Sequence, residues 1–202
     1  VFSVALQDVA GNTVLTSTNL VTVVAQGFTG IVSGGVVAAI SGVANFVGLH
    51  LTRTGTFTLR FSEVGGQLVD VSGFIVNPGV TTALVVTQQP TNAVSGIPFP
   101  VQPVVVARDA FGNTASLEIA SVTVLLGSGT GVLTGTTVLP LSLGICTFAG
   151  LSVDIVGSKV LRFRLGVLTV DSSQLTITFA SASKLAILTQ PGVTRVAPFI
   201  LI

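Results

Sequence analysis

The chain contains one sequence module twice, and the copies are not divided at its midpoint. Residues 1–81 match residues 102–182, and residues 82–101 match residues 183–202, at an offset of 101 positions. We therefore expect one complete copy at 82–182, with an incomplete copy before it and an unpaired opening segment after it. Repetition at this length indicates tandem domains of one fold, which constrains the chain more than any single side chain does.

Short motifs carry the match between the two copies. They pair residues 8–13 with 109–114, 29–34 with 130–135, and 84–90 with 185–191. The first pair brings together Asp, Gly and Asn, which favour turns through side-chain hydrogen bonds or a positive φ. The offset becomes 102 where residues 42–46 match residues 144–148, and it returns to 101 where residues 69–70 match residues 170–171.

Apolar and polar residues alternate in short runs rich in Val, Thr, Leu and Ile, separated by Gly, Pro, Asn and Asp. A period of two is the pattern of β-strands. In the complete copy it predicts strands near residues 84–88, 101–108, 120–126, 131–139, 144–149, 159–165 and 173–180. About seven short strands in a module of roughly 100 residues are typical of an immunoglobulin-like sandwich. We predict an all-β chain of two tandem immunoglobulin-like β-sandwich domains, the first lacking its opening strand or strands.

The repeat divides the chain into three segments. Residues 1–81 are predicted to form immunoglobulin-like domain 1, which is incomplete and is expected to be completed by a strand from another subunit. Residues 82–182 are predicted to form immunoglobulin-like domain 2, which is complete. Residues 183–202 are predicted to be an orphan apolar strand segment that matches residues 82–101.

Four stretches of the complete copy carry a family likeness: residues 84–90, 104–113, 129–135 and 148–151. In these stretches the module resembles the immunoglobulin-like tandem repeats of bacterial cell-surface proteins and large adhesins. The likeness covers the complete copy and, in permuted order, nearly all of the remaining chain. It implies a sandwich fold and an extracellular or cell-surface location. Such repeats serve as stalks, adhesins and fibre subunits, so the fold alone does not select one of these roles.

Charge and hydropathy argue against nucleic-acid binding and against a membrane-spanning segment. Eight basic and seven acidic residues are scattered along the chain, which has a formal net charge of +1. Because no basic stripe is present to contact phosphates, we expect no nucleic-acid partner. The chain is 49% hydrophobic, but it has no uninterrupted run of about 18 apolar residues, so we expect no membrane span. The expected partners are identical subunits, with a surface glycan or host ligand left open.

The sequence lacks the residue sets of catalytic and metal sites. His50 is the only histidine, and Ser152 takes its place in the second copy, so no His pair or general base recurs. Cys146 is the only cysteine, and its counterpart Ala44 predicts a small buried core residue rather than a reactive thiol. We expect a protein that is not an enzyme, with no catalytic residue, no cofactor and no metal.

Acidic residues recur between the copies, Asp8 with Asp109 and Asp70 with Asp171. Calcium takes about six to eight oxygen ligands, and one acid at each place is too few. We interpret these carboxylates as turn caps.

The orphan segment complements the incomplete domain. A sandwich without its first strand exposes backbone groups along one edge, which recruits other strands. We expect the tail of one subunit to complete the first domain of another, giving a helical filament by donor-strand exchange. The expected donor contacts are Leu185, Ile187, Val196, Phe199, Ile200, Leu201 and Ile202. The expected acceptor edge, which is equally an N-terminal strand inserting beside the tail, consists of Phe2, Val4 and Leu6.

Two other interpretations stay open. The chain is also compatible with an excerpt of a longer covalent array that serves as an adhesin stalk or binding module, in which case the permutation is an accident of where the sequence is cut. Alternatively the tail folds back onto domain 1 of its own chain. That third arrangement needs the domains side by side, whereas tandem repeats usually run end to end, so we rank it last.

Overall fold

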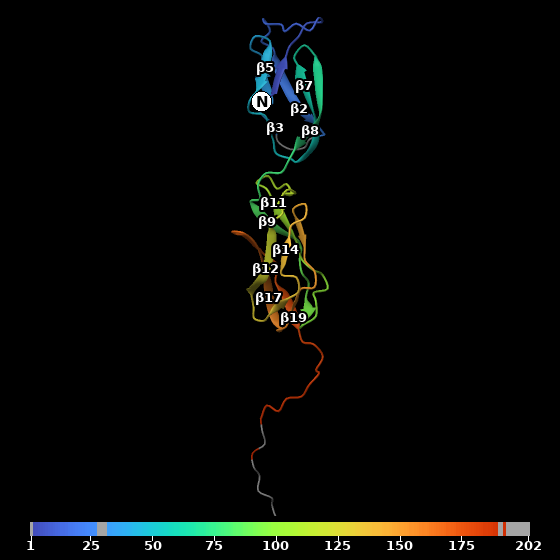
Figure 1. Cartoon of the computed structure of the whole chain (residues 1–202), viewed down its shortest axis with the longest axis vertical. Coiled ribbons are helices and arrows are strands. Elements are labelled where there is room, and N and C mark those ends of the chain that lie inside the picture. Colours follow the sequence, from blue (N-terminus) through green and yellow to red (C-terminus); the bar gives the residue numbers. More distant parts are fainter. Residues whose placement is uncertain (1, 28–31, 190–191, 193–202) are drawn as a thin grey trace, which may run out of the picture.

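The computed structural model describes residues 2–27, 32–189 and 192. These residues form two β-sandwich domains that follow one another along the long axis of the molecule (Figure 1). Within the described ranges, no helix is long and apolar enough to cross a membrane. The structure confirms the predicted all-β fold of tandem immunoglobulin-like sandwiches.

Domain 2 is the more complete sandwich. Its strands are β9 (Ala83–Gln88), β10 (Ala93–Val94), β11 (Val104–Arg108), β12 (Ser121–Ser128), β13 (Leu133–Thr134), β14 (Val138–Pro140), β15 (Ile145–Thr147), β16 (Ser152–Val153), β17 (Gly157–Leu165), β18 (Leu168–Asp171) and β19 (Leu175–Thr178). One sheet has the order β10-β19-β17-β12-β14, with β18 beside β17, and the facing sheet has the order β15-β11-β9. Strand β9 is antiparallel to β11, whereas β10 is parallel to β19.

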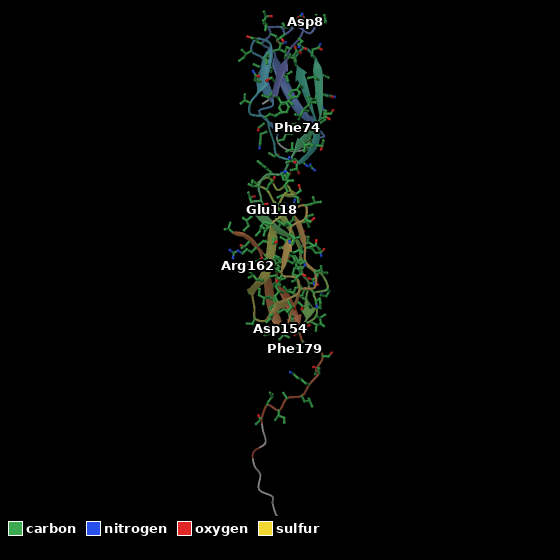
Figure 2. All side chains as sticks on the ribbon, viewed as in Figure 1. Asp8, Phe74, Glu118, Asp154, Arg162 and Phe179 are labelled. Carbon is green, nitrogen blue, oxygen red and sulfur yellow. The ribbon has the colours of Figure 1, made fainter. Side chains whose placement is uncertain are left out.

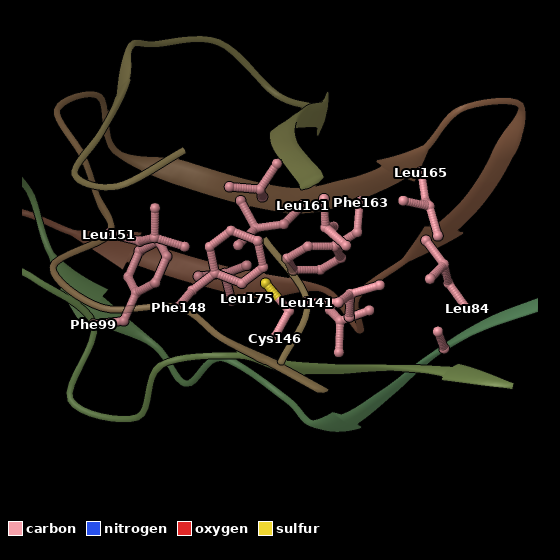
Figure 3. Packing of buried hydrophobic residues seen from close by; sticks show 14 of the residues in the cluster. Leu84, Phe99, Leu141, Cys146, Phe148, Leu151, Leu161, Phe163, Leu165 and Leu175 are labelled. Atoms are coloured by element: carbon pink, nitrogen blue, oxygen red, sulfur yellow. The ribbon is translucent and has the colours of Figure 1, made fainter. Parts of the chain in front are cut away.

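The core of domain 2 lies between these sheets. Alternate residues of β17 point inward, so Leu161 and Phe163 are fully buried while Arg162 between them stays exposed. Figure 3 shows Phe148 and Phe163 together in the centre of this core, with a ring-centroid distance of 5.4 Å. Cys146 is buried beside them, which confirms its predicted place in the core.

Domain 1 repeats this architecture with fewer strands among the described residues. They are β1 (Phe2–Ala5), β2 (Leu20–Gln26), β3 (Val32–Ser33), β4 (Val36–Ala38), β5 (Val43–Phe46), β6 (His50–Leu51), β7 (Gly55–Glu63) and β8 (Leu68–Val76). One sheet has the order β4-β2-β7-β8, and it faces the antiparallel pair β1-β5. Residues 77–82 connect β8 to β9.

The prediction of one strand over residues 131–139 is wrong, because β13 and β14 are separate strands. Gly135 lies between them with a φ of +101°, and a Cβ there would overlap the carbonyl oxygen of Gly150. The same close approach recurs in domain 1 between Gly34 and Gly48. A break that only glycine permits therefore interrupts the alternating pattern. Strands β10, β16 and β18 also fall outside the predicted ranges.

Candidate assembly site

Domain 1 presents an uncovered edge where domain 2 carries β9. In domain 2, β9 covers one edge of β11, with Val86 opposite Val105 and Leu84 opposite Ala107. Strand β1 is the counterpart of β11. Among the described residues β1 pairs with β5 on one side, and no strand lies on its other side. The backbone groups on that side are free to bind an added strand.

A second uncovered position lies on the facing sheet. In domain 2, the short strand β10 pairs in parallel with β19, with Ala93 opposite Ile177. The counterpart of β19 is the end of β8, which pairs with β7. Leu175 and Ile177 are buried in β19, whereas their counterparts Phe74 and Val76 are only partly buried. Both positions therefore correspond to one missing stretch, the counterpart of residues 82–101.

The missing stretch leaves the same core positions more exposed in domain 1. Val105 is fully buried, and its counterpart Val4 is only partly buried. Ala115 is 2% exposed, whereas its counterpart Val14 is 37% exposed. Since the paired positions belong to the same module, the difference reports the absent strand rather than a different fold.

Val4 and Val14 line a groove of about 440 Å³. Its apolar lining includes Val4, Leu6, Val14, Val21 and Phe61. In domain 2, the counterparts of all five belong to or pack in the core cluster that also contains Leu84. In domain 2, the buried side chain of Leu84 packs against these counterparts, and no described residue of domain 1 takes that place.

The far end of the groove is polar. Figure 3 shows Leu84 beside Leu165 at one end of the domain 2 core. The counterpart of Leu165 is Glu63, which lines the groove of domain 1. Glu63 accepts a hydrogen bond from Asn19 at 2.7 Å and another from the backbone N–H of Gly65, so its carboxylate is held at the rim.

The structure places the expected acceptor residues Phe2 and Val4 on one face of β1, and Leu6 directly after its end. Val4 and Leu6 line the groove. Phe2 lies further along, with its ring centroid 5.5 Å from that of Phe74 and 6.3 Å from that of Phe61. Their reception of a strand stays a prediction.

The expected donor residues are only partly described. Leu185 is 103% exposed and Ile187 is 83% exposed. Residues 179–189 continue away from domain 2 (Figure 1), so the described tail does not fill the groove of its own chain. The remaining expected donors lie outside the described residues: Val196, Phe199, Ile200, Leu201 and Ile202.

The junction between the domains is a contact that the sequence analysis missed. Asn113 donates from its side-chain amide to the carbonyl oxygen of Thr52 at 2.8 Å and accepts the backbone N–H of Thr54 at 3.2 Å. The backbone N–H of Gly79 donates to Asp109 at 3.0 Å. The matched Asp-Gly-Asn motifs indicated a turn, but not what the turn would contact.

Hydrogen bonds keep Asp109 ionised in this junction. Asp109 is 5% exposed, and burial alone would raise the pKa of its carboxyl. Hydrogen bonds from Asn113, Gly79 and Phe111 outweigh burial, and the pKa lies below its ordinary value. A buried carboxylate with several donors is a stable part of the interface.

The turn-cap prediction holds for one pair of acids and is wrong for the other. Asp8 and Asp109 cap turns, because each accepts backbone N–H groups two and four residues later. Asp70 and Asp171 instead lie in strands, where they form cross-strand ion pairs of 2.7 Å with Arg60 and Arg162. Residue type alone predicted a turn, whereas these ion pairs depend on the register between paired strands. Each arginine lowers the pKa of its acid through a hydrogen bond.

His50 and Cys146 are the two residues whose side chains have potential reactivity, and neither lies in a catalytic arrangement among the described residues. His50 is exposed at the domain junction, with its ring centroid 5.2 Å from that of Phe111. Burial raises the pKa of the Cys146 thiol to about 11, which disfavours the thiolate nucleophile. The described part of the chain contains no group of three or more side chains arranged to hold a metal ion.

The comparisons with known proteins find likeness in solved structures alone. No protein-family model matches the chain, and no curated protein matches it. The D00-D0 domain of intimin aligns with 78% of this chain and 78% of that one, at 15% identity and a TM-score of 0.41. The D0-D1 domain of intimin aligns with 87% of each chain at 13% identity and a TM-score of 0.36. Domains 4 and 5 of the S-layer protein SbsC align with 86% of this chain and 78% of that one, at 15% identity and a TM-score of 0.36.

Proposed function

We propose that this chain is a non-enzymatic structural subunit of an extracellular, cell-surface fibre. Subunits polymerise when the segment 183–202 of one copy adds the missing strand to domain 1 of the next. The observation that carries this proposal is the groove beside β1, which domain 2 fills with β9 and which lies next to an uncovered strand edge. The cell-surface location is supported by the resemblance of the module to bacterial surface repeats.

The sequence of the tail fits the groove in one register. Leu185 and Ile187 match Leu84 and Val86, the two β9 residues that face the domain 2 core. Transferred to domain 1, the pairing of β9 with β11 sets Leu185 opposite Leu6 and Ile187 opposite Val4. Slipping by one residue would turn these side chains to solvent, so the apolar groove specifies the register.

The end of the tail has a counterpart in the core of domain 2. Pro198 and Phe199 repeat the pair Pro98-Phe99 at an offset of 100. Phe99 is 3% exposed, and its backbone N–H donates to the carbonyl oxygen of Leu151 at 2.9 Å. Phe199 would accordingly cover Leu49, the counterpart of Leu151, at the end of domain 1 opposite the groove.

The exchange is favoured by apolar burial and by satisfied backbone groups. Leu185 and Ile187 are almost fully exposed, and burying such a side chain contributes about 1.5–3 kcal/mol. Backbone hydrogen bonds to the edge of β1 give further affinity, as in other strand-addition complexes. The contact joins two different surfaces, and a heterologous contact that does not close on itself produces a filament.

A substitution in the tail tests this function against a matched control. Leu185→Asp places a charge where the proposal needs a core residue, and we expect it to abolish polymerisation of the subunit. Leu188→Asp is the control: Leu188 is 95% exposed, and its counterpart Thr87 faces away from the core. Electron microscopy and sedimentation measure filament formation. Filaments of the Leu185→Asp variant that equal those of the control would reject the proposal.

The runner-up is a stalk in which further modules are joined covalently. The observed junction supports the covalent stalk, because the two modules linked by residues 77–82 dock end to end with direct hydrogen bonds. In that case the strand that completes domain 1 belongs to the same polypeptide. Mass spectrometry of the denatured native material distinguishes the two: a mass near 20.4 kDa, the mass of two modules, supports strand exchange between copies, and a larger mass that contains further modules supports the array.

A further inference from the structure

The Asp8–Asn12 loop of domain 1 is built like the Asp109–Asn113 loop of domain 2, which contacts domain 1 at the junction. Asp8 Oδ1 accepts the backbone N–H groups of Ala10 and Asn12 at 2.9 Å each, and Asn12 donates to Asp8 Oδ2 at 3.0 Å. In domain 2, Asp109 Oδ1 accepts Phe111 and Asn113 at the same 2.9 Å. The loop therefore takes its docking conformation in domain 1 without a docked neighbour.

The two loops differ in what covers them. Asn113 is partly buried because its amide bridges Thr52 and Thr54 of the preceding domain. Asn12 is exposed, and Val9 beside it is 109% exposed. Figure 2 places Asp8 at one end of the molecule, beyond all the strands of domain 1. The Asp8–Asn12 loop therefore repeats one of the two surfaces of the junction, with its bridging amide exposed.

The opposite end of the subunit offers the groups that such an amide binds. The counterparts of Thr52 and Thr54 are Asp154 and Val156, at the end of domain 2 where Figure 2 labels Asp154. The junction bonds go to a backbone carbonyl and a backbone N–H, so changing the side chains from Thr to Asp and Val preserves both groups. The carbonyl oxygen of Asp154 already accepts the hydroxyl of Ser95 and has a second lone pair for another donor.

The aromatic pair of the observed junction has no aromatic counterpart at the second one. At the observed junction the ring of Phe111 lies against that of His50. At the second pair of ends, Ala10 replaces Phe111, and His50 is replaced by Ser152, which is 6% exposed and hydrogen-bonded to Thr134. Both members of the ring pair are thus replaced by small residues together, and neither surface is left with an aromatic ring that lacks its partner.

We propose that the Asp8–Asn12 loop docks on residues 154–156 of domain 2 in a second copy of this chain. Asn12 donates to the carbonyl oxygen of Asp154 and accepts the backbone N–H of Val156, as Asn113 does with Thr52 and Thr54 within one chain. The inference rests on the proposed function for its partner, a second copy. It adds the register of the joint: successive subunits are collinear, with domain 2 of one abutting domain 1 of the next.

The test is Asn12→Ala, with Asn113→Ala as the matched control within the same motif. Association of copies is measured by analytical ultracentrifugation of the full chain. Loss of two hydrogen bonds is expected to weaken association about tenfold. Asn113→Ala removes the equivalent bonds inside the chain and is expected to leave the association constant within about twofold.

A second measurement does not depend on a substitution. Hydrogen exchange of the Val156 amide in the wild-type chain is expected to slow by at least tenfold on assembly, because Asn12 accepts that N–H. Unchanged exchange at Val156 in assembled material would overturn the docking proposal, as would unaltered association of the Asn12→Ala variant.

The Leu185→Asp variant separates the two proposals. If it abolishes assembly while Asn12→Ala has no effect, strand exchange holds and the loop docking is wrong. If Asn12→Ala weakens association while Leu185→Asp has no effect, the docking holds and strand exchange is wrong. Loss of association in both variants supports both proposals, and loss in neither rejects both.

Discussion

The two domains share one module, yet one has a closed core and the other an open groove. Domain 2 buries 18 residues in a single apolar cluster, whereas the described part of domain 1 buries seven. The strands common to both keep the same pairing, including the cross-strand ion pairs. Residues 82–101 contribute Leu84, Ala93 and Phe99 to the domain 2 cluster, and Leu165 of that cluster has the polar counterpart Glu63 in domain 1. The comparison teaches that domain 1 keeps the strand pairing without a described counterpart of residues 82–101, whereas the core positions beside that stretch are more exposed.

The largest expected effect comes from weakening β9 in the closed domain. Leu84→Ala removes a side chain that is 6% exposed, and large-to-small core changes cost about 2–5 kcal/mol. The same change at Leu185 in the free subunit should alter the free energy of unfolding by less than about 0.5 kcal/mol, because that residue is fully exposed. Chemical denaturation of both variants measures the contrast. Equal losses would mean that the tail is already packed within its own chain.

The open domain is expected to gain stability from the strand it lacks. A synthetic peptide of residues 183–202 should stabilise domain 1 by about 2.7 kcal/mol at a hundredfold excess over its dissociation constant. Domain 2, which already contains β9, should unfold at an unchanged temperature. Differential scanning calorimetry with and without the peptide resolves the two transitions. A peptide with Leu185 and Ile187 both replaced by Asp is the control, and an equal shift with that peptide would contradict the account.

A smaller effect is expected from acid at the domain junction. The pKa of Asp109 is lower in the folded chain than in the unfolded one, so its contribution to stability is complete above the unfolded pKa of about 4. That contribution is lost as the pH falls through the folded pKa. Small-angle scattering should show the domains uncoupling below about pH 4. Asp109→Asn should flatten this dependence, while Asp171→Asn, remote from the junction, should leave it in place.

The smallest expected effect concerns the ion pairs that both domains share. Arg60 and Arg162 each donate two hydrogen bonds to their aspartates, on faces where the side chains are 40% and 45% exposed. Exposed pairs of this kind contribute about 0.2–1 kcal/mol. Arg60→Ala and Arg162→Ala should therefore give similar, small losses in denaturation. A loss several times larger in one domain would show that its pair supports the sandwich in a way the other does not.

The fold was predictable because strand alternation and internal repetition act locally. Residues 161–165, for example, form a strand in which each second side chain is apolar and buried. The split at Gly135 was not predictable from alternation, because it arises from the close approach to the carbonyl of Gly150, which lies between β15 and β16. Asp171 was misassigned because its ion pair depends on the register between β17 and β18.

The candidate site was predictable in outline from the repeat alone. Alignment shows which stretch domain 1 lacks, and alternation shows which face of β1 points inward, so Val4 and Leu6 could be named. The junction could not, because the bonds from Asn113 to Thr52 and Thr54 depend on how two domains dock. The only signal in the sequence was that the motif of residues 109–114 repeats that of residues 8–13.

The most direct test is a cryo-electron microscopy structure of the assembled native material, resolved well enough to trace side chains in the groove of domain 1. The account predicts that Leu185 and Ile187 of a neighbouring copy lie in that groove, opposite Leu6 and Val4, with a break in the main chain between subunits. An empty groove would contradict the account, as would a groove filled by a segment covalently continuous with the acceptor's own Val1.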